Sequence, residues 1–208
     1  MKKLGIILYF ALAYIIFFSS CSPRIRFDTG LQGPQIKRIF LQKLEDIRPI
    51  NEKEGYKIFY VDSISDKDYD HGFLAEFRRG LIKKLDESFI LVLDKEKADI
   101  VMDISVRHFY GEYSQSVKTV FWEYGTVILL FLPRLITDAI PYNRFAGRVA
   151  MDLSFTGKDG KKISRSLDIK ITGNVCTYKR GSAGTASRLS EAASPELNAI
   201  LREILDEI

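Results

Sequence analysis

The sequence predicts an α/β domain of the α+β type: a single small, mostly antiparallel mixed sheet, with helices packed on one face and a hydrophobic insertion before the last hairpin. Three observations predict this fold. Apolar and polar residues alternate over 98–108 and over 148–155, as in strands that bury one face. Apolar residues recur at spacings of three and four after Asp70 and near the C-terminus, as in amphipathic helices. Asp159-Gly160 supplies the turn residues of a hairpin.

The first twenty residues have the parts of a secretory signal. Lys2 and Lys3 give a basic start, residues 4–18 form an uncharged apolar run, and Ser19-Ser20 are the small residues that a signal peptidase needs before its cut. The run is too short for an ordinary membrane span, which needs about 20 apolar residues. We therefore expect residues 1–20 to be a signal peptide.

Phe18-Ser19-Ser20-Cys21 resembles the lipobox of bacterial lipoproteins, with Phe18 where that family usually has Leu. The resemblance implies cleavage before Cys21, a diacylglycerol on its sulfur and an acyl chain such as palmitate on the new amine. The alternative is a plain secreted protein whose Cys21 lies at the cut. Ser22 stands where an Asp retains many lipoproteins at the inner membrane. The resemblance therefore implies the cell outer membrane, on its periplasmic or surface face.

About 188 residues remain without the signal, which is enough for one domain with a core. Residues 21–36 hold two glycines and two prolines with little periodicity, so they predict a flexible tether. A single domain should then occupy residues 37–208. Without Lys2 and Lys3 the formal charge falls from +4 to +2, which does not indicate nucleic-acid binding.

The domain should begin with two strands, at 38–44 and 56–64, separated by a turn at 51–55. Asp70 then precedes an amphipathic helix that should cover the sheet, and a short apolar run follows at 90–93. The apolar positions of this helix are Leu74, Phe77, Leu81 and Leu85.

The clearest strand covers residues 98–108. Its alternation places Ile104 at the centre of an apolar face, where we expect it to be fully buried, and places His108 on the same face. Strands at 148–155 and 163–175 should form the last hairpin. Ser194-Pro195-Glu196 combines a cap, a proline for the first helical position and an early acid, so it predicts the start of a C-terminal helix.

Residues 119–141 form a hydrophobic insertion between two predicted strands. Glu123 and Arg134 leave only ten uncharged residues between them, and Pro133 would interrupt a helix, so a full membrane crossing is not expected. As a helix, the insertion would have a broad apolar face that must meet the domain core, lipid or a protein partner. The candidate partner- or lipid-contact residues are Trp122, Ile128, Leu129, Phe131, Leu132 and Leu135.

Three aspartates at 66, 68 and 70 with Gly72 only partly match a calcium loop. The loop glycine belongs at the sixth position and here is the seventh, and the twelfth position is Phe77 instead of an acid. We expect no metal here, and instead a solvated turn whose last carboxylate caps the following helix.

Other chemical motifs are weak. His71 and His108 have no neighbouring motif, and the sequence contains no H-E-x-x-H, G-x-S-x-G or C-x-x-C pattern. Residues 181–185 are rich in glycine but lack the lysine of a P-loop, so we expect a flexible loop. With Cys21 acylated, Cys176 has no partner for an intrachain disulfide and is expected to be a buried small hydrophobe.

The lipobox at Cys21 and the order of the elements resemble small bacterial envelope lipoproteins: the YajG-like and transport-auxiliary lipoproteins, and the lipoprotein partner of lipopolysaccharide assembly. The resemblance implies a non-enzymatic accessory of envelope assembly or transport, with a lipid anchor, a protein or lipid partner, and no cofactor besides the covalent lipid. The alternatives are an envelope enzyme whose site is assembled from dispersed residues, such as Asp62, Asp66 or His108, and a purely structural lipoprotein.

Overall fold

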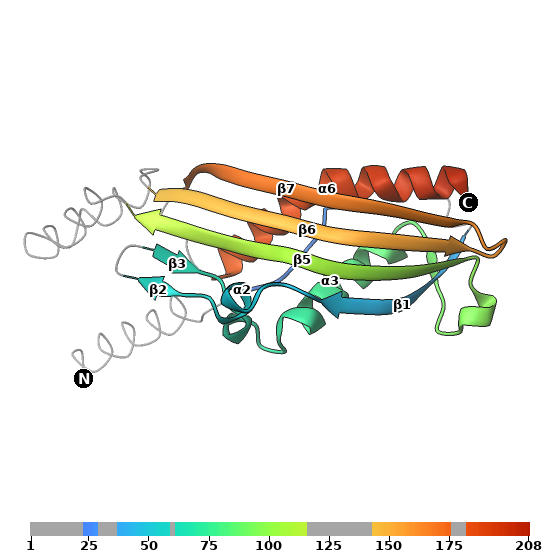
Figure 1. The fold of residues 1–208 in the computed structure, drawn as a ribbon, viewed down its shortest axis with the longest axis horizontal. Coiled ribbons are helices and arrows are strands. Elements are labelled where there is room, and N and C mark those ends of the chain that lie inside the picture. Colours follow the sequence, from blue (N-terminus) through green and yellow to red (C-terminus); the bar gives the residue numbers. More distant parts are fainter. Residues whose placement is uncertain (1–22, 29–36, 59–60, 116–142, 176–181) are drawn as a thin grey trace, which may run out of the picture.

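A computed structural model describes residues 23–28, 37–58, 61–115, 143–175 and 182–208 (Figure 1). Within these ranges the elements run in chain order as follows: β1 (Arg38–Asp46), α2 (Ile50–Glu54), β2 (Lys57–Ile58), β3 (Val61–Ser63), the 3-10 turn η1 (Asp66–Asp68), α3 (Phe73–Asp86), β4 (Ile90–Leu91), the 3-10 turn η2 (Lys95–Lys97), β5 (Ile100–Gln115), β6 (Asn143–Gly157), β7 (Lys162–Val175) and α6 (Ser182–Glu207).

The described residues form one seven-stranded mixed sheet around the long strand β5. On one edge of β5, β1 pairs in parallel with the first half of the strand and β3 pairs antiparallel with its end. On the other edge, β6 pairs antiparallel along the whole of β5, and β7 pairs antiparallel with β6. β4 lies parallel to β1, and β2 lies antiparallel to β3. The predicted mostly antiparallel mixed sheet is confirmed.

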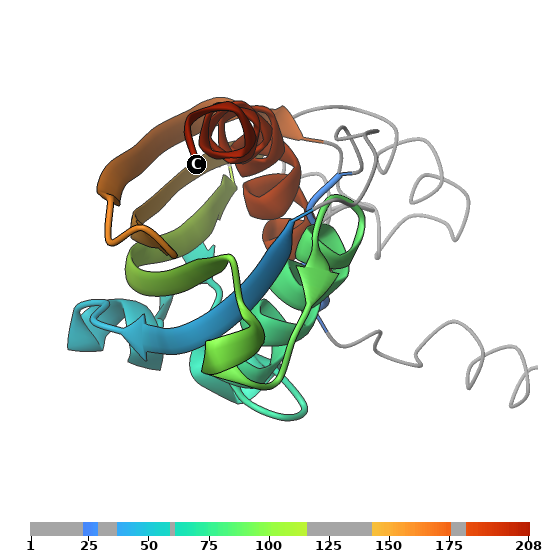
Figure 2. The same cartoon turned by 90° about the vertical axis from the view of Figure 1, so that its right-hand side faces the viewer.

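Both long helices, α3 and α6, lie on the same face of this sheet, and Figure 2 shows the two of them side by side along it. The inner rows of the strands supply the sheet's half of the core. Ile104 is 1% exposed, so its predicted burial is confirmed. The inward row of β5 comprises Ile100, Met102, Ile104, Val106, Phe109 and Tyr113.

A bulge in β5 between Val106 and His108 reverses the alternation of the strand. Up to Val106 the even-numbered residues face the helices, whereas after the bulge Phe109 and Tyr113 do so. An extra residue in one strand of a pair shifts all later side chains to the opposite face. The prediction that His108 lies on the apolar face is therefore wrong, and His108 belongs to the outer face of the sheet.

Three local predictions also differ from the structure. The predicted strand at 56–64 is two short strands, β2 and β3, and the predicted turn at 51–55 is the short helix α2. Helix α3 is capped by Gly72 at φ 78°, so Asp70 does not cap it. Gly72 tolerates this positive φ without steric cost.

Helix α6 begins at Ser182, twelve residues before the predicted start, and contains Pro195 in its interior. It replaces the loop predicted at 181–185. The helix lies unusually close to the sheet here, since a Cβ on Gly111 would lie 2.5 Å from Thr185 Cγ2 and one on Gly147 would lie 2.7 Å from Leu189 Cδ2. The two glycines are paired across β5 and β6. Ala186, Leu189 and Ala193 are buried against this flat surface. Their burial stabilises the helical turns that precede Pro195, so the helix continues through the proline instead of starting there.

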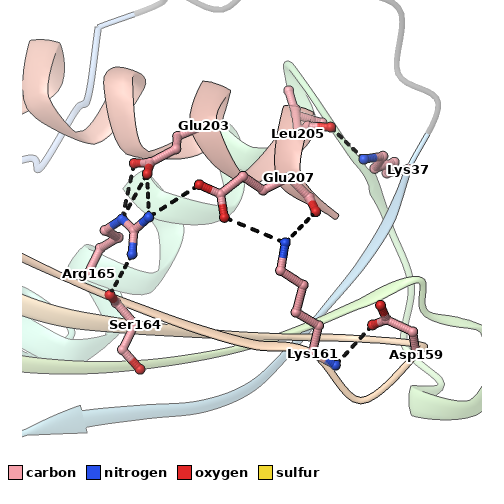
Figure 3. A network of polar contacts seen from close by, with 8 residues as sticks. All are labelled: Lys37, Asp159, Lys161, Ser164, Arg165, Glu203, Leu205 and Glu207. Carbon is pink, nitrogen blue, oxygen red and sulfur yellow. Dashed lines mark hydrogen bonds and ion pairs between the residues drawn. The ribbon is translucent and has the colours of Figure 1, made fainter.

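Lysine and arginine side chains bind the C-terminal end of α6 to the sheet (Figure 3). Lys37 Nζ donates to the Leu205 carbonyl at 2.5 Å and Lys161 Nζ to the Glu207 carbonyl at 2.9 Å, where the helix dipole favours positive charge. Arg165 of β7 reaches Glu203 from the inward row of the strand. β7 is an edge strand among the described residues, and an inward-pointing charge protects such an edge from pairing with another chain.

An ion pair joins the starts of β1 and β5, and it makes a testable prediction. Arg38 donates to both carboxylate oxygens of Asp99, at 3.0 and 2.8 Å. These hydrogen bonds lower the pKa of Asp99 to about 2. An NMR titration should place its midpoint there. Arg38→Gln should raise the pKa toward its usual value of about 4 without reaching it, because the backbone N–H of residue 38 still donates to Asp99 Oδ2 at 2.9 Å. Arg38→Lys should raise it less.

The sign of the effect on stability follows from this lowered pKa. The pair stabilises the fold above about pH 4, where Asp99 is ionised in both folded and unfolded chains, and its contribution is lost as the pH falls toward 2. A midpoint near 4 in the unmodified protein would contradict the pairing.

Candidate functional site

Residues 23–28 enter the domain between the two long helices. Pro23, Ile25 and Phe27 are buried and alternate with the exposed residues Arg24, Arg26 and Asp28. Ile25 is 3% exposed and Phe27 6%, and both belong to the hydrophobic core. For these residues the structure differs from the predicted tether, because one apolar side chain in every two supplies enough buried surface to fix an extended segment. We call residues 23–28 the anchor segment.

Polar and steric contacts from both helices hold the anchor segment. Ser190 and Ser194 of α6 accept hydrogen bonds from the backbone N–H groups of Arg26 and Asp28, at 3.3 and 2.7 Å. On α3, the buried Lys84 donates to the Asp28 carbonyl at 2.5 Å. Gly80 lets the segment pass against α3, since a Cβ there would lie 2.4 Å from the Ile25 carbonyl oxygen. In Figure 2 the segment lies on the helix side of the sheet.

The predicted site residues all lie outside the described residues: Cys21 for lipidation, and Trp122, Ile128, Leu129, Phe131, Leu132 and Leu135 for contact with lipid or a partner. Cys176 lies outside them as well. The strands on either side of the insertion are described, and Gln115 of β5 pairs with Asn143 of β6 as the last rung of their ladder. The described helices include none that is long and apolar enough to cross a membrane.

The outer face of the sheet carries polar side chains beside α2, in two hydrogen-bonded groups. Nδ1 of His108 lies 2.5 Å from Oε1 of Glu52, which α2 presents to β5. Further along β5, the hydroxyls of Tyr56 and Tyr110 lie 2.7 Å apart, and both donate to Glu112. Burial and the hydrogen bond to Glu112 raise the pKa of Tyr110 far above its usual range, and they raise that of Tyr56 as well. Both tyrosines therefore remain neutral donors at physiological pH.

The charged residues of the neighbouring strands are also paired. Arg148 of β6 donates to both oxygens of Asp168 on β7, at 2.9 and 2.7 Å, and this lowers the pKa of Asp168. Arg107 lies 3.0 Å from Asp152. The contact found for His108 is the carboxylate of Glu52, whereas nucleophilic catalysis would need a hydroxyl or thiol beside the ring.

Two of the three aspartates that partly match a calcium loop, Asp66 and Asp68, have structural contacts. Asp68 and Ser65 form a reciprocal capping box around η1. Asp66 accepts a hydrogen bond at 2.7 Å from the buried Arg48, whose guanidinium also binds Asp46 and lies 3.5 Å from the centre of the Phe73 ring. Burial opposes ionisation of Asp46, but the bonds from Arg48 prevail and lower its pKa. In the described ranges no three His, Cys, Asp or Glu side chains gather as a metal site would need.

Sequence reasoning did not identify the partner of His108, because Glu52 is 56 residues away and belongs to a segment expected to be a turn. One local signal was available. Phe109 follows directly on the polar pair Arg107 and His108 and is followed by Tyr110, which breaks the alternation of 98–106 and is typical of a bulge.

No protein-family model matches the sequence, and no curated protein matches it. Three solved structures are similar to it in outline: a DUF330 protein from Xanthomonas campestris (10% identity, 86% of this chain and 90% of that chain, TM-score 0.49), an uncharacterized protein (12%, 86% and 99%, 0.47) and lipoprotein GNA1162 from Neisseria meningitidis (9%, 82% and 99%, 0.35). All three TM-scores are below 0.5, so these structures support no conclusion about function.

Proposed function

We propose that the protein is a lipoprotein of the bacterial outer membrane, anchored through Cys21, and that it acts as a non-enzymatic accessory in envelope assembly or transport. One observation carries the proposal. The signal peptide expected at residues 1–20 ends in Ser19-Ser20, directly before Cys21, and the described fold begins two residues after that cysteine, with the buried Pro23. Cleavage before Cys21 would therefore leave a modified terminus directly beside the described fold.

The contacts on the outer face favour an accessory over an enzyme. Its acids and bases are bound to one another: His108 to Glu52, Arg148 to Asp168, and both tyrosine hydroxyls to Glu112. Paired charges of this kind are typical of a solvated protein surface. Asp66 and His108, two residues named for the enzyme alternative, have different partners: Arg48 and Glu52.

The hydrophobic insertion is the proposed contact element for a lipid or protein partner. It joins the paired ends of β5 and β6 and holds Leu129 and Leu132. Two acyl chains already hold a protein stably in a membrane, whereas one binds only marginally. A diacylglycerol on Cys21 supplies both chains, so the apolar residues of the insertion are not needed for residence in the membrane.

Complementation of a deletion strain tests whether Cys21 provides the anchor and the insertion provides the contact with a partner. Changing both Leu129 and Leu132 to Ser should leave the protein fatty-acylated in the outer-membrane fraction but should fail to restore exclusion of a large fluorescent dye. The matched control is Leu93→Ser, which removes a fully exposed leucine of the described surface and should restore exclusion. Full function of the double variant, or its release from the membrane, would contradict the proposal.

The enzyme alternative rests on the close His108–Glu52 pair and on Glu52 Oε2, which is buried without a hydrogen-bond partner. Under the accessory proposal His108→Gln should complement the deletion fully. Loss of complementation by a His108→Gln protein with an unchanged melting temperature would favour the enzyme instead.

A further inference from the structure

We infer that the exposed side of α3, together with Arg24 and Arg26, lies against an anionic phospholipid surface, so that the helix layer faces the membrane and the polar outer face of the sheet faces away. This orientation rests on the proposed lipidation of Cys21. Three observations on the described residues support it: where the anchor segment enters the fold, the charge around that point, and the apolar residues that α3 leaves exposed.

The entry point of the chain fixes which surface is near the lipid. Ser22 alone separates Cys21 from the buried Pro23, and two residues of extended chain span at most about 7 Å. The anchor segment cannot lengthen this link without losing the burial of Ile25 and Phe27 and the hydrogen bonds to Ser190 and Ser194. An acylated Cys21 therefore holds the groove between α3 and α6 close to the bilayer.

Positive charge gathers around this entry point. The alternation of the anchor segment buries its apolar side chains and leaves Arg24 and Arg26 exposed. Gly80 touches Ile25, and at about 100° per residue Arg79 and Lys83 lie on the neighbouring side of α3, whereas Arg78 lies on the far side. Arg79 also pairs with the buried Glu76 at 2.9 Å. The exposed acids of these two elements are Asp28 and Asp86. Basic residues beside a lipid anchor are attracted by anionic headgroups within a Debye length.

Exposed apolar side chains on α3 complete the surface. Leu74 is 39% exposed and Ile82 37%, and they lie two helical turns apart with Arg78 between them. Leucine and isoleucine beside arginine and lysine are the composition of a helix that lies in the membrane interface. On the opposite face of the sheet the charges and hydroxyls are paired with one another. The exposed apolar residues near α2 on that side are Ile47, Ile50 and Tyr56.

The test uses the lipidated protein in vesicles of phosphatidylcholine and phosphatidylglycerol that contain a nitroxide-headgroup lipid as quencher. In a Cys176→Ser background, a fluorophore is placed at Ile82→Cys or at Ser164→Cys. Ser164 is exposed on the outer face, and Figure 3 shows its side chain pointing away from α6. We expect the label at residue 82 to lose most of its fluorescence and the label at residue 164 to lose little.

Charge reversal separates attraction from mere proximity. Arg24→Glu, Arg26→Glu and Lys83→Glu together should weaken quenching at residue 82, as should replacing phosphatidylglycerol with phosphatidylcholine. The matched control reverses three exposed lysines elsewhere, Lys158, Lys162 and Lys170, and should leave the quenching unchanged. Equal quenching at residues 82 and 164 in protein that floats with the vesicles would overturn the orientation alone. Protein purified from membranes of cells that make the full chain with no lipid on Cys21 would instead overturn the proposed function.

Discussion

Cys21→Ala should abolish the incorporation of labelled fatty acid, remove the protein from the outer-membrane fraction and leave a precursor that retains residues 1–20. The sulfur of Cys21 is the proposed attachment point of the diacylglycerol, and cleavage by the lipoprotein pathway follows that modification. The expected change is from one lipidated terminus per chain to none, the largest effect that we predict for a single substitution. Gel fluorography and the mass of the purified chain would measure it.

The control for this substitution is Cys176→Ala, which removes the only other cysteine and should leave labelling unchanged. Because the anchor segment begins at Pro23, neither change removes a described core side chain. Continued labelling of the Cys21→Ala protein would mean that the lipid, if present, is attached elsewhere.

Phe77→Ala should have the largest effect on stability, lowering the free energy of unfolding by about 3–5 kcal/mol. Phe77 is fully buried at the centre of an aromatic cluster, with ring centres 5.6 Å from Phe27, 5.5 Å from Phe73 and 6.0 Å from Phe109. Truncation would leave a cavity where the anchor segment, α3 and β5 meet. Denaturant unfolding followed by circular dichroism measures the loss.

Leu74→Ala is the matched control on the same helix. Leu74 is partly exposed, so the change should alter the free energy of unfolding by only about 0.5 kcal/mol. Similar losses for the two variants would mean that the buried and exposed faces of α3 are assigned wrongly. A loss for Phe77→Ala that is accompanied by proteolytic cleavage at Arg24 or Arg26 would further indicate that the anchor segment is released with the core.

The sequence predicted those parts of the fold that depend on long, regular patterns. The alternation of 98–106 and 148–155 predicted β5 and β6, and the spacing of apolar residues after Asp70 predicted α3, because burial on one face imposes a period on the chain. The mixed sheet with helices on one face followed from the order of these elements.

Tertiary packing decided what the sequence did not predict. The bulge after Val106 moved His108 to the outer face, where Glu52 from a distant helix binds it. Alternating apolar residues fixed the anchor segment in a groove whose walls come from α3 and α6, which are far apart in the chain. Close packing on Gly111 and Gly147 carried α6 through Pro195. Such contacts join residues too far apart in sequence for a local pattern to reveal them.

The mass of the N-terminal peptide of the mature protein tests the central claim most directly. Protein purified from the outer membrane of cells that make the full chain is digested, and the peptide containing residue 21 is measured by mass spectrometry. Lipid anchoring at Cys21 predicts a peptide that begins at Cys21 and carries a diacylglycerol with a further acyl chain. A peptide that begins at or before residue 21 with an unmodified cysteine would contradict the claim, and with it the membrane-facing orientation of the helix layer.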